Sequence, residues 1–321
     1  MNPYTNVNFF EFFWVLAKRI WLFATGGGTG LATDEVQLGV LACCSIACGL
    51  LGPFLVLKRL SMFANSLSHT TLLGIAGAFL FASHWWGSGM TDLSTLLIGA
   101  CLSAVLTAGL TEILSRVFRL APDASIGLSF TTLFAIGVIL VSVFTRDTHL
   151  STEAVTGNCD ALQLSDLRLA MSVALVNIAA VIVFYRPLML ISFDEPYLRA
   201  LGFSAPLWRF CLFFLTALTV VCSFRAVGVL VVLALLMGPY LTARLFCHQL
   251  TRLVIWTPLC GVGIALISVA LSRAILSSTG VALSTGGILT LTTAIVFVCG
   301  ALVRTIITKL ALDKRQSLSQ N

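Results

Sequence analysis

Two side chains in this sequence have the types and spacing of a metal-binding pair, Asn65 and His69. They are four residues apart, so on a helix they share one face. An imidazole nitrogen suits zinc, copper, iron or nickel, whereas an amide oxygen is a weak, hard ligand. Because two side chains cannot fill a shell of about four to six ligands, a second copy of the helix or bound water would have to complete it. The same spacing fits a hydrogen-bonded pair at a helix end, and the residues alone leave both interpretations open.

The segment from Phe193 to Phe203 is predicted to form a short amphipathic helix between two membrane spans. Asp194, Glu195 and a proline suit the start of a helix, and Gly202 suits its end. A helix that does not cross the membrane is well placed to press on a partner, and an ordinary interfacial loop helix is the alternative. The residues assigned to this segment are Asp194, Glu195, Leu198, Arg199 and Gly202.

The remaining polar and helix-breaking positions suggest structural roles. Asp123 precedes an apolar run and is expected to cap a helix N-terminus. Gly228, Gly238 and Pro239 interrupt late apolar runs, as in the broken helices of transporters but also in helices that are merely kinked. The sequence has no Walker A pattern and no convergent Ser–His–Asp set, so it indicates neither an ATP-binding chain nor an enzyme.

The composition sets the fold class that must position these residues. Of the 321 residues, 58% are hydrophobic and only 10% are charged, and the mean hydropathy is +1.02. A soluble domain carries about 25% charged residues, so we predict an all-α polytopic membrane protein with eight or nine transmembrane helices. The predicted spans are 36–57, 63–83, 93–115, 126–146, 167–187, 207–224, 227–246, 253–276 and 284–305.

The cations predict the orientation of these spans. Basic residues fall in alternate loops and in the C-terminal tail, so the positive-inside rule places those loops and the C-terminus in the cytoplasm and residues 147–166 outside. The net charge of +6 is explained in this way, and we expect no nucleic-acid partner. Cys159 lies in the outside segment, where it is expected to be free or paired with another chain. The other nine cysteines lie in or beside apolar runs and are expected to pack as small hydrophobic residues.

The chain is expected to have three parts. Residues 1–35 hold an aromatic-rich amphipathic helix, Phe9–Phe23, and a Gly-rich joint. Lys18 and Arg19 would lie near mid-membrane if this helix crossed, so it is expected to lie in the membrane interface in contact with lipid. Residues 36–305 form the transmembrane domain, and residues 306–321 form a cytoplasmic tail.

Five motifs in order resemble the membrane subunits of ABC-type importers for zinc, manganese and iron, the metal ABC-3 permease family. The resemblance covers residues 36–305. It is carried by Gly49–Ser61, Ala64–His69, Asp123–Gly127, Phe193–Gly202, and the run from Val227 through Leu236 with Pro239 and Ala243.

The resemblance implies a permease of the bacterial inner membrane that dimerises and has no chemistry of its own. It implies two further partners, a separate cytoplasmic ATPase and an extracytoplasmic metal-binding protein. It also implies that Asn65 and His69 line the path of a divalent metal ion, with His69 as a ligand, and that residues 193–203 couple to the ATPase. We expect Glu195→Arg and Leu198→Asp to uncouple ATP use from uptake without unfolding the protein. No permanently bound cofactor is expected.

Two departures from the family pattern bear on this expectation. Asn65 stands where the family usually has an acidic residue, and Tyr240 stands where it has a small one. Either the ion is handled less tightly, or a different permease chain in a heterodimer supplies the missing carboxylate. The rival functions are a siderophore- or vitamin-type ABC permease, an ion-driven secondary transporter, and a receptor or scaffold.

Overall fold

The computed structural model describes Tyr4 and residues 9–25, 32–58, 60–86, 93–144, 159–280 and 283–319. In these ranges every regular element is an α-helix. Judged on the described residues, eight helices are long and apolar enough to cross a membrane, and α3 provides the ninth predicted span. The helices are α1 (Phe9–Ala24), α2 (Thr33–Leu57), α3 (Ser61–Trp86), α4 (Leu93–Val117), α5 (Pro122–Phe144), α7 (Leu164–Val183), α8 (Tyr185–Phe193), α9 (Glu195–Ala200), α10 (Ala205–Val227), α11 (Val229–Phe246), α12 (Leu250–Thr279) and α13 (Thr285–Ser319).

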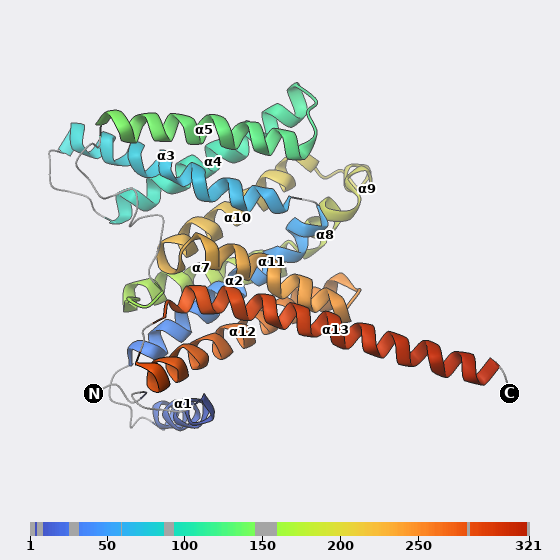
Figure 1. Ribbon diagram of the computed structural model, residues 1–321. Coiled ribbons are helices and arrows are strands. Elements are labelled where there is room, and N and C mark those ends of the chain that lie inside the picture. The colour runs from blue at the N-terminus through green and yellow to red at the C-terminus, as the bar shows by residue number, and fades with distance from the viewer. Residues whose placement is uncertain are drawn as a thin grey trace.

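Each predicted span overlaps a helix whose ends differ from it by a few residues, and two differences stand out. The span predicted at 167–187 ends at Val183, and α8 follows from Tyr185. Pro187 has no N–H for the carbonyl of Val183, so the helix breaks there. The last helix continues to Ser319, so the predicted tail is helical as far as it is described. Figure 1 shows this end of α13 projecting beyond the other helices.

The helices divide into two groups that α10 joins. In Figure 1, α3, α4 and α5 lie together at one side of the molecule. In the other group α2 is central, since it packs against α7, α10, α11 and α12. Because α10 also packs against α3 and α4, a movement of α10 affects both groups.

The cations predicted to share one side of the membrane gather at one end of the bundle. Lys58 follows α2, Glu112 and Arg116 lie near the end of α4, and Arg209 lies in the first turns of α10. Ion pairs bring Lys58, Glu112 and Arg209 together with Glu195 of α9. We call this the basic end, and we call the end at the start of α2 the opposite end.

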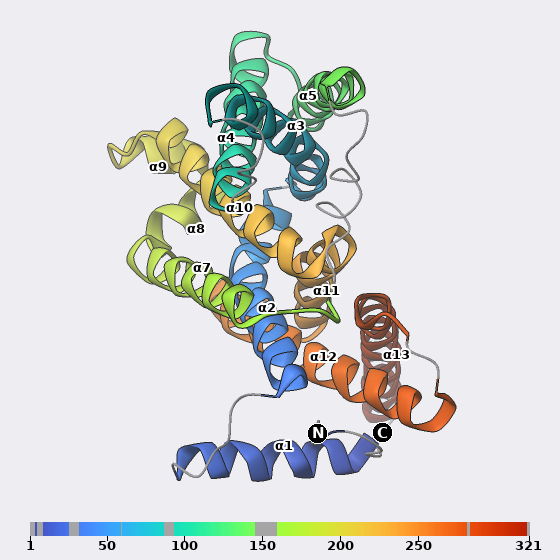
Figure 2. The same ribbon diagram turned by 90° about the vertical axis from the view of Figure 1, so that its left-hand side faces the viewer.

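At the opposite end, α1 lies across the direction of the long helices (Figures 1 and 2). Its inner face buries Phe12 and Leu16. The Tyr4 hydroxyl donates a hydrogen bond of 3.0 Å to the Glu35 carboxylate, which also pairs with Arg19. These contacts fix α1 to the start of α2. The outer face of α1 exposes large aromatic side chains: Phe10, Trp14 and Trp21.

The opposite end also contains Cys159, which the sequence left open as free or paired with another chain. All ten cysteines are free in this chain. The Cys159 thiol is buried and donates to the carbonyl of Val227 at 3.0 Å. Burial raises the pKa of Cys159 to about 12, so it stays a protonated thiol that packs between elements.

Candidate metal path

In the half of α3 nearer the basic end, the helix face that carries Asn65 and His69 is partly exposed. Asn65 is exposed and His69 is half-buried. Met62, which is 61% exposed, precedes Asn65 by three residues and His69 by seven. These three side chains therefore share one helix face. Sequence reasoning missed Met62, although its spacing and its soft thioether could have signalled it.

Two aromatic rings of α5 hold the His69 imidazole. The ring centroid of Phe130 lies 5.3 Å from that of His69, and the centroid of Phe134 lies 5.6 Å away in an edge-on arrangement. The rings restrict the imidazole without supplying a ligand. The orientation of His69 is thus fixed by its neighbours. Polar side chains within a membrane-spanning helix are costly, so their presence there suggests a function.

This face alone does not form a complete metal site. Among the described residues no cluster of three or more His, Cys, Asp or Glu side chains is placed to hold a metal ion. The imidazole of His69, the amide of Asn65 and the thioether of Met62 would bind a metal ion only weakly, so the ion could dissociate again. Such a set suits passage of an ion better than its permanent retention.

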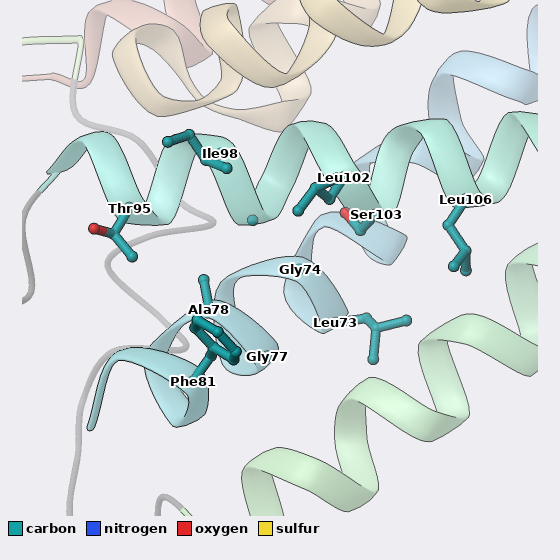
Figure 3. A pocket seen from close by; sticks show the side chains of 11 residues that line it. Leu73, Gly74, Gly77, Ala78, Phe81, Thr95, Ile98, Leu102, Ser103 and Leu106 are labelled. Carbon is teal, nitrogen blue, oxygen red and sulfur yellow. The ribbon is translucent and has the colours of Figure 1, made fainter. Parts of the chain in front are cut away.

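Beside this face, α3 and α4 enclose an apolar groove of about 620 Å³ (Figure 3). Leu73, Phe81, Ile98, Leu102 and Leu106 contribute to its walls, and Thr95 and Ser103 are its hydroxyl-bearing residues. A dehydrated metal ion finds almost no ligands there. The groove therefore suits apolar chains of the surrounding bilayer, and Leu73 and Gly77 in its lining continue the helix face of His69 toward the other end of α3.

At the basic end, the predicted short helix is α9. The Asp194 side chain accepts a hydrogen bond of 3.0 Å from the backbone N–H of Tyr197, which caps the helix. Pro196 occupies the first turn. Gly202 follows the helix with φ of +84°, a conformation that other residues rarely adopt.

The faces of α9 correct one expectation from the sequence. Leu198 is fully buried against Ile191 and Ala205, so Leu198→Asp would disrupt folding locally instead of acting at a surface. Glu195 also points inward, because it pairs with Arg209 of α10. The sequence could not reveal this orientation, since it depends on where α10 packs. The large exposed hydrophobic side chains of this segment are Phe193, Tyr197, Leu201 and Phe203.

Glu195 is the centre of a group of cations. Its carboxylate lies 2.5 Å from Arg209, 2.6 Å from Arg199 and 3.6 Å from Lys58. Burial opposes its ionisation, but the hydrogen bonds and charges of Arg199 and Arg209 outweigh burial and lower the pKa of Glu195. Burial, together with the charge of Arg209, lowers the pKa of Lys58 to about 8. The Lys58 ammonium also donates to the carbonyl of Ile191 at 3.0 Å.

Asp123 is not at the position that the sequence predicts. α5 begins at Pro122, which is favoured at the first helical position, so Asp123 lies inside the first turn and not at the N-cap. Its exposed carboxylate there meets the positive end of the helix. In the structure Asp123 is thus a helix-terminus residue.

The predicted break at Gly228 separates α10 from α11, with φ of +89°. By contrast, α11 continues through Gly238 and Pro239, so no break occurs there. A Cβ added at Gly238 would collide with Thr293 of α13, so this glycine permits close helix packing. Tyr240 is fully buried, and its hydroxyl accepts a hydrogen bond of 2.7 Å from Arg244. The bulky residue that departs from the family pattern is thus a core residue.

Comparison with known proteins identifies the family of the chain. The family model of the ABC 3 transport family matches residues 35–304. The chain belongs to the ABC 3 transport family. The match leaves all of α1 and the projecting end of α13 outside the family region.

Two relatives and one solved structure illustrate the similarity. A "Probable metal transport system membrane protein" of Chlamydia muridarum is 36% identical over 90% of this chain and 90% of its own length. The "Manganese transport system membrane protein MntD" of Bacillus subtilis is 35% identical over 70% of this chain and 78% of its own. The structure described as "PsaBC from Streptococcus pneumoniae in complex with Fab" superposes with a TM-score of 0.68 at 25% identity, covering 89% of this chain and 95% of that chain.

Proposed function

We propose that this chain is the membrane-spanning permease subunit of an ATP-driven importer of divalent metal ions, in the bacterial inner membrane. The observation that carries the proposal is the exposed α3 face with Asn65 and His69, in a chain of the ABC 3 transport family. A polar helix face at membrane depth requires a polar occupant, and an imidazole favours a transition-metal ion. Manganese, zinc and iron are the candidate substrates.

The incomplete ligand set supports assembly as a dimer. A second permease copy would bring another imidazole and amide to the same ion and so raise the number of ligands. A paralogous permease would instead supply a carboxylate, which Asn65 lacks, and so restore a negative charge for the dication. The composition of the purified complex distinguishes a homodimer from a heterodimer.

The basic end is proposed to face the cytoplasm, with the C-terminus, and to receive the ATPase at α9. The exposed Tyr197 of α9 and Leu201, which directly follows the helix, form an apolar outer surface, while Leu198 anchors the inner face of α9. ATP hydrolysis would belong to that separate subunit. A partner shifts the balance between inward- and outward-facing conformations only through contacts that differ between them. The ATPase would therefore act through its contact with the outer surface of α9.

The opposite end is proposed to face an extracytoplasmic metal-binding protein. α1 would lie in the interface of the outer leaflet, because Trp14 and Trp21 are exposed on one face of a helix that runs across the spanning helices. Its ion pair with Glu35 would keep it at that level.

The test is ATP-dependent uptake into vesicles that hold this chain with its ATPase and binding protein. Free manganese, zinc and iron are compared with the same metals in chelated form. We expect uptake of at least one free ion that requires all three components. Uptake of chelates alone would replace the proposal with a chelate permease, and uptake without the ATPase would replace it with a secondary transporter.

A further inference from the structure

Four charged side chains from four segments meet at the basic end: Lys58 after α2, Glu112 of α4, Glu195 of α9 and Arg209 of α10. We call them the Arg209 cluster. All four side chains are between 15% and 20% exposed. Partly buried charges strongly favour a paired state, so a displacement of one member requires its partners to follow or to be replaced.

Arg209 binds the carboxylate of Glu195 more closely than that of Glu112. Its Nη2 lies 2.7 Å from Oε1 and 2.5 Å from Oε2 of Glu195, whereas its Nη1 lies 3.4 Å from Glu112. The guanidinium is thus tightly bound to α9 and loosely bound to α4. A planar guanidinium can serve two carboxylates at once, which a lysine ammonium does less well.

The cluster has room in which to rearrange. A cavity of about 250 Å³ is lined by all four members together with Thr111 and Phe213. Among the residues that the structure describes, the buried Nε of Arg209 and the buried hydroxyl of Thr111 have no hydrogen-bond partner. Arg209 therefore has an unused donor, and the cavity that it lines also reaches Thr111 and Glu112 of α4.

A short series of packed side chains connects Arg209 to α3, the helix that carries Asn65 and His69. Phe213 lies one turn further along α10 and stacks on Phe63 of α3, with 4.3 Å between ring centroids. Both rings are buried. Phe63 precedes Asn65 by two residues. In addition, Lys58 contacts both Glu195 and the carbonyl of Ile191, and α3 begins only three residues later.

We propose that Arg209 is a positioning residue that transmits movement of α9 to α3 and α4, by shifting between Glu195 and Glu112. This inference rests on the proposed transport function. When the ATPase displaces α9, the pair with Glu195 weakens and the 3.4 Å contact with Glu112 closes. The charge stays paired throughout, and α10 carries Phe213 and the start of α3 with it.

The test measures metal ions imported per ATP hydrolysed in the reconstituted complex. Arg209→Gln is expected to lower this ratio by roughly 5- to 150-fold, the range typical of coupling between sites. Glu112→Gln is expected to lower it too, although Glu112 makes no ion pair with α9 among the described residues. The double variant should be no worse than Arg209→Gln alone, because both changes break one link. Arg209→Lys keeps the charge and should keep the complex assembled, yet lower the ratio.

The matched control is Arg116→Gln, which removes the other cation bound to Glu112 but has no ion pair with α9 or α10 among the described residues. We expect its ratio within about twofold of the wild type. Wild-type coupling in Arg209→Gln, or an equal loss in Arg116→Gln, overturns the inference while leaving the transport function intact. Absence of ATP-dependent uptake by the wild type overturns the transport function and this inference with it.

Discussion

The position of α3, the helix that carries Asn65 and His69, depends on a close crossing with α4, which makes Gly74 a sensitive position. A Cβ added at Gly74 would lie 2.7 Å from the carbonyl carbon of Gly99 and 2.5 Å from the Ser103 hydroxyl. Since carbon atoms pack at about 3.5–4.0 Å, Gly74→Ala must push the helices apart by ~1 Å. The Gly99 carbonyl belongs to the backbone and cannot rotate away.

Gly77 on the same helix is the matched control, because a Cβ there meets nothing within 4 Å. Both substitutions gain up to ~1 kcal/mol of helix propensity, so the difference between the two variants isolates the clash. Overpacking typically costs about 1–3 kcal/mol. We therefore expect Gly74→Ala to be less stable than Gly77→Ala by ~1–3 kcal/mol.

The assay is equilibrium unfolding of the purified variants in one detergent, with metal uptake measured on the same preparations. Gly77→Ala should match or slightly exceed the wild type in stability and should transport normally. Gly74→Ala should lose stability and reduce uptake, because α3 carries Asn65 and His69. Equal stability of the two variants would refute the close crossing and the reasoning built on it.

Two further predictions concern α9 and its surroundings. Below pH 8, Lys58 is charged and pairs with Glu195; as the pH rises through about 8 it loses its proton, so metal imported per ATP should fall. Loss of this proton does not itself destabilise the fold, because the unfolded chain keeps the proton up to its ordinary pKa of 10.5, so Lys58 contributes increasing stability to the folded state as the pH rises from about 8 to 10.5. Lys58→Arg should remove the fall, and a fall that persists in it would contradict the assignment. Leu198→Ala should lower stability by ~2–5 kcal/mol in unfolding experiments, whereas Tyr197→Ala should keep stability within about 0.5 kcal/mol and weaken ATPase binding in pull-down assays. Equal stability of the two variants would contradict the observed faces of α9.

The membrane spans could be predicted from the sequence because their physical cause is local. Runs of about 20 apolar residues form helices wherever they cross a bilayer, and the basic loops between them gather at one end of the structure. The early end of α7 is a local effect of Pro187 that the apolar pattern obscured. The family resemblance rests on motifs in chain order and is borne out by the match over residues 35–304.

The orientation of single side chains could not be predicted in the same way. A six-residue helix such as α9 has too few residues to define its buried face, so the inward position of Glu195 and Leu198 depends on α10. The Arg209 cluster joins residues up to 151 positions apart (Lys58 to Arg209), which no local pattern connects. The metal-path role of Asn65 and His69 remains a prediction.

The central claim is that His69 lies on the path of a metal ion driven by a separate ATPase. Its most direct test is ATP-dependent uptake of zinc, manganese and iron into vesicles that hold the assembled complex, with wild-type protein and His69→Ala compared at equal amounts. We predict uptake of at least one ion by the wild type and a clear loss in His69→Ala with assembly intact. Unchanged uptake in His69→Ala would contradict the account.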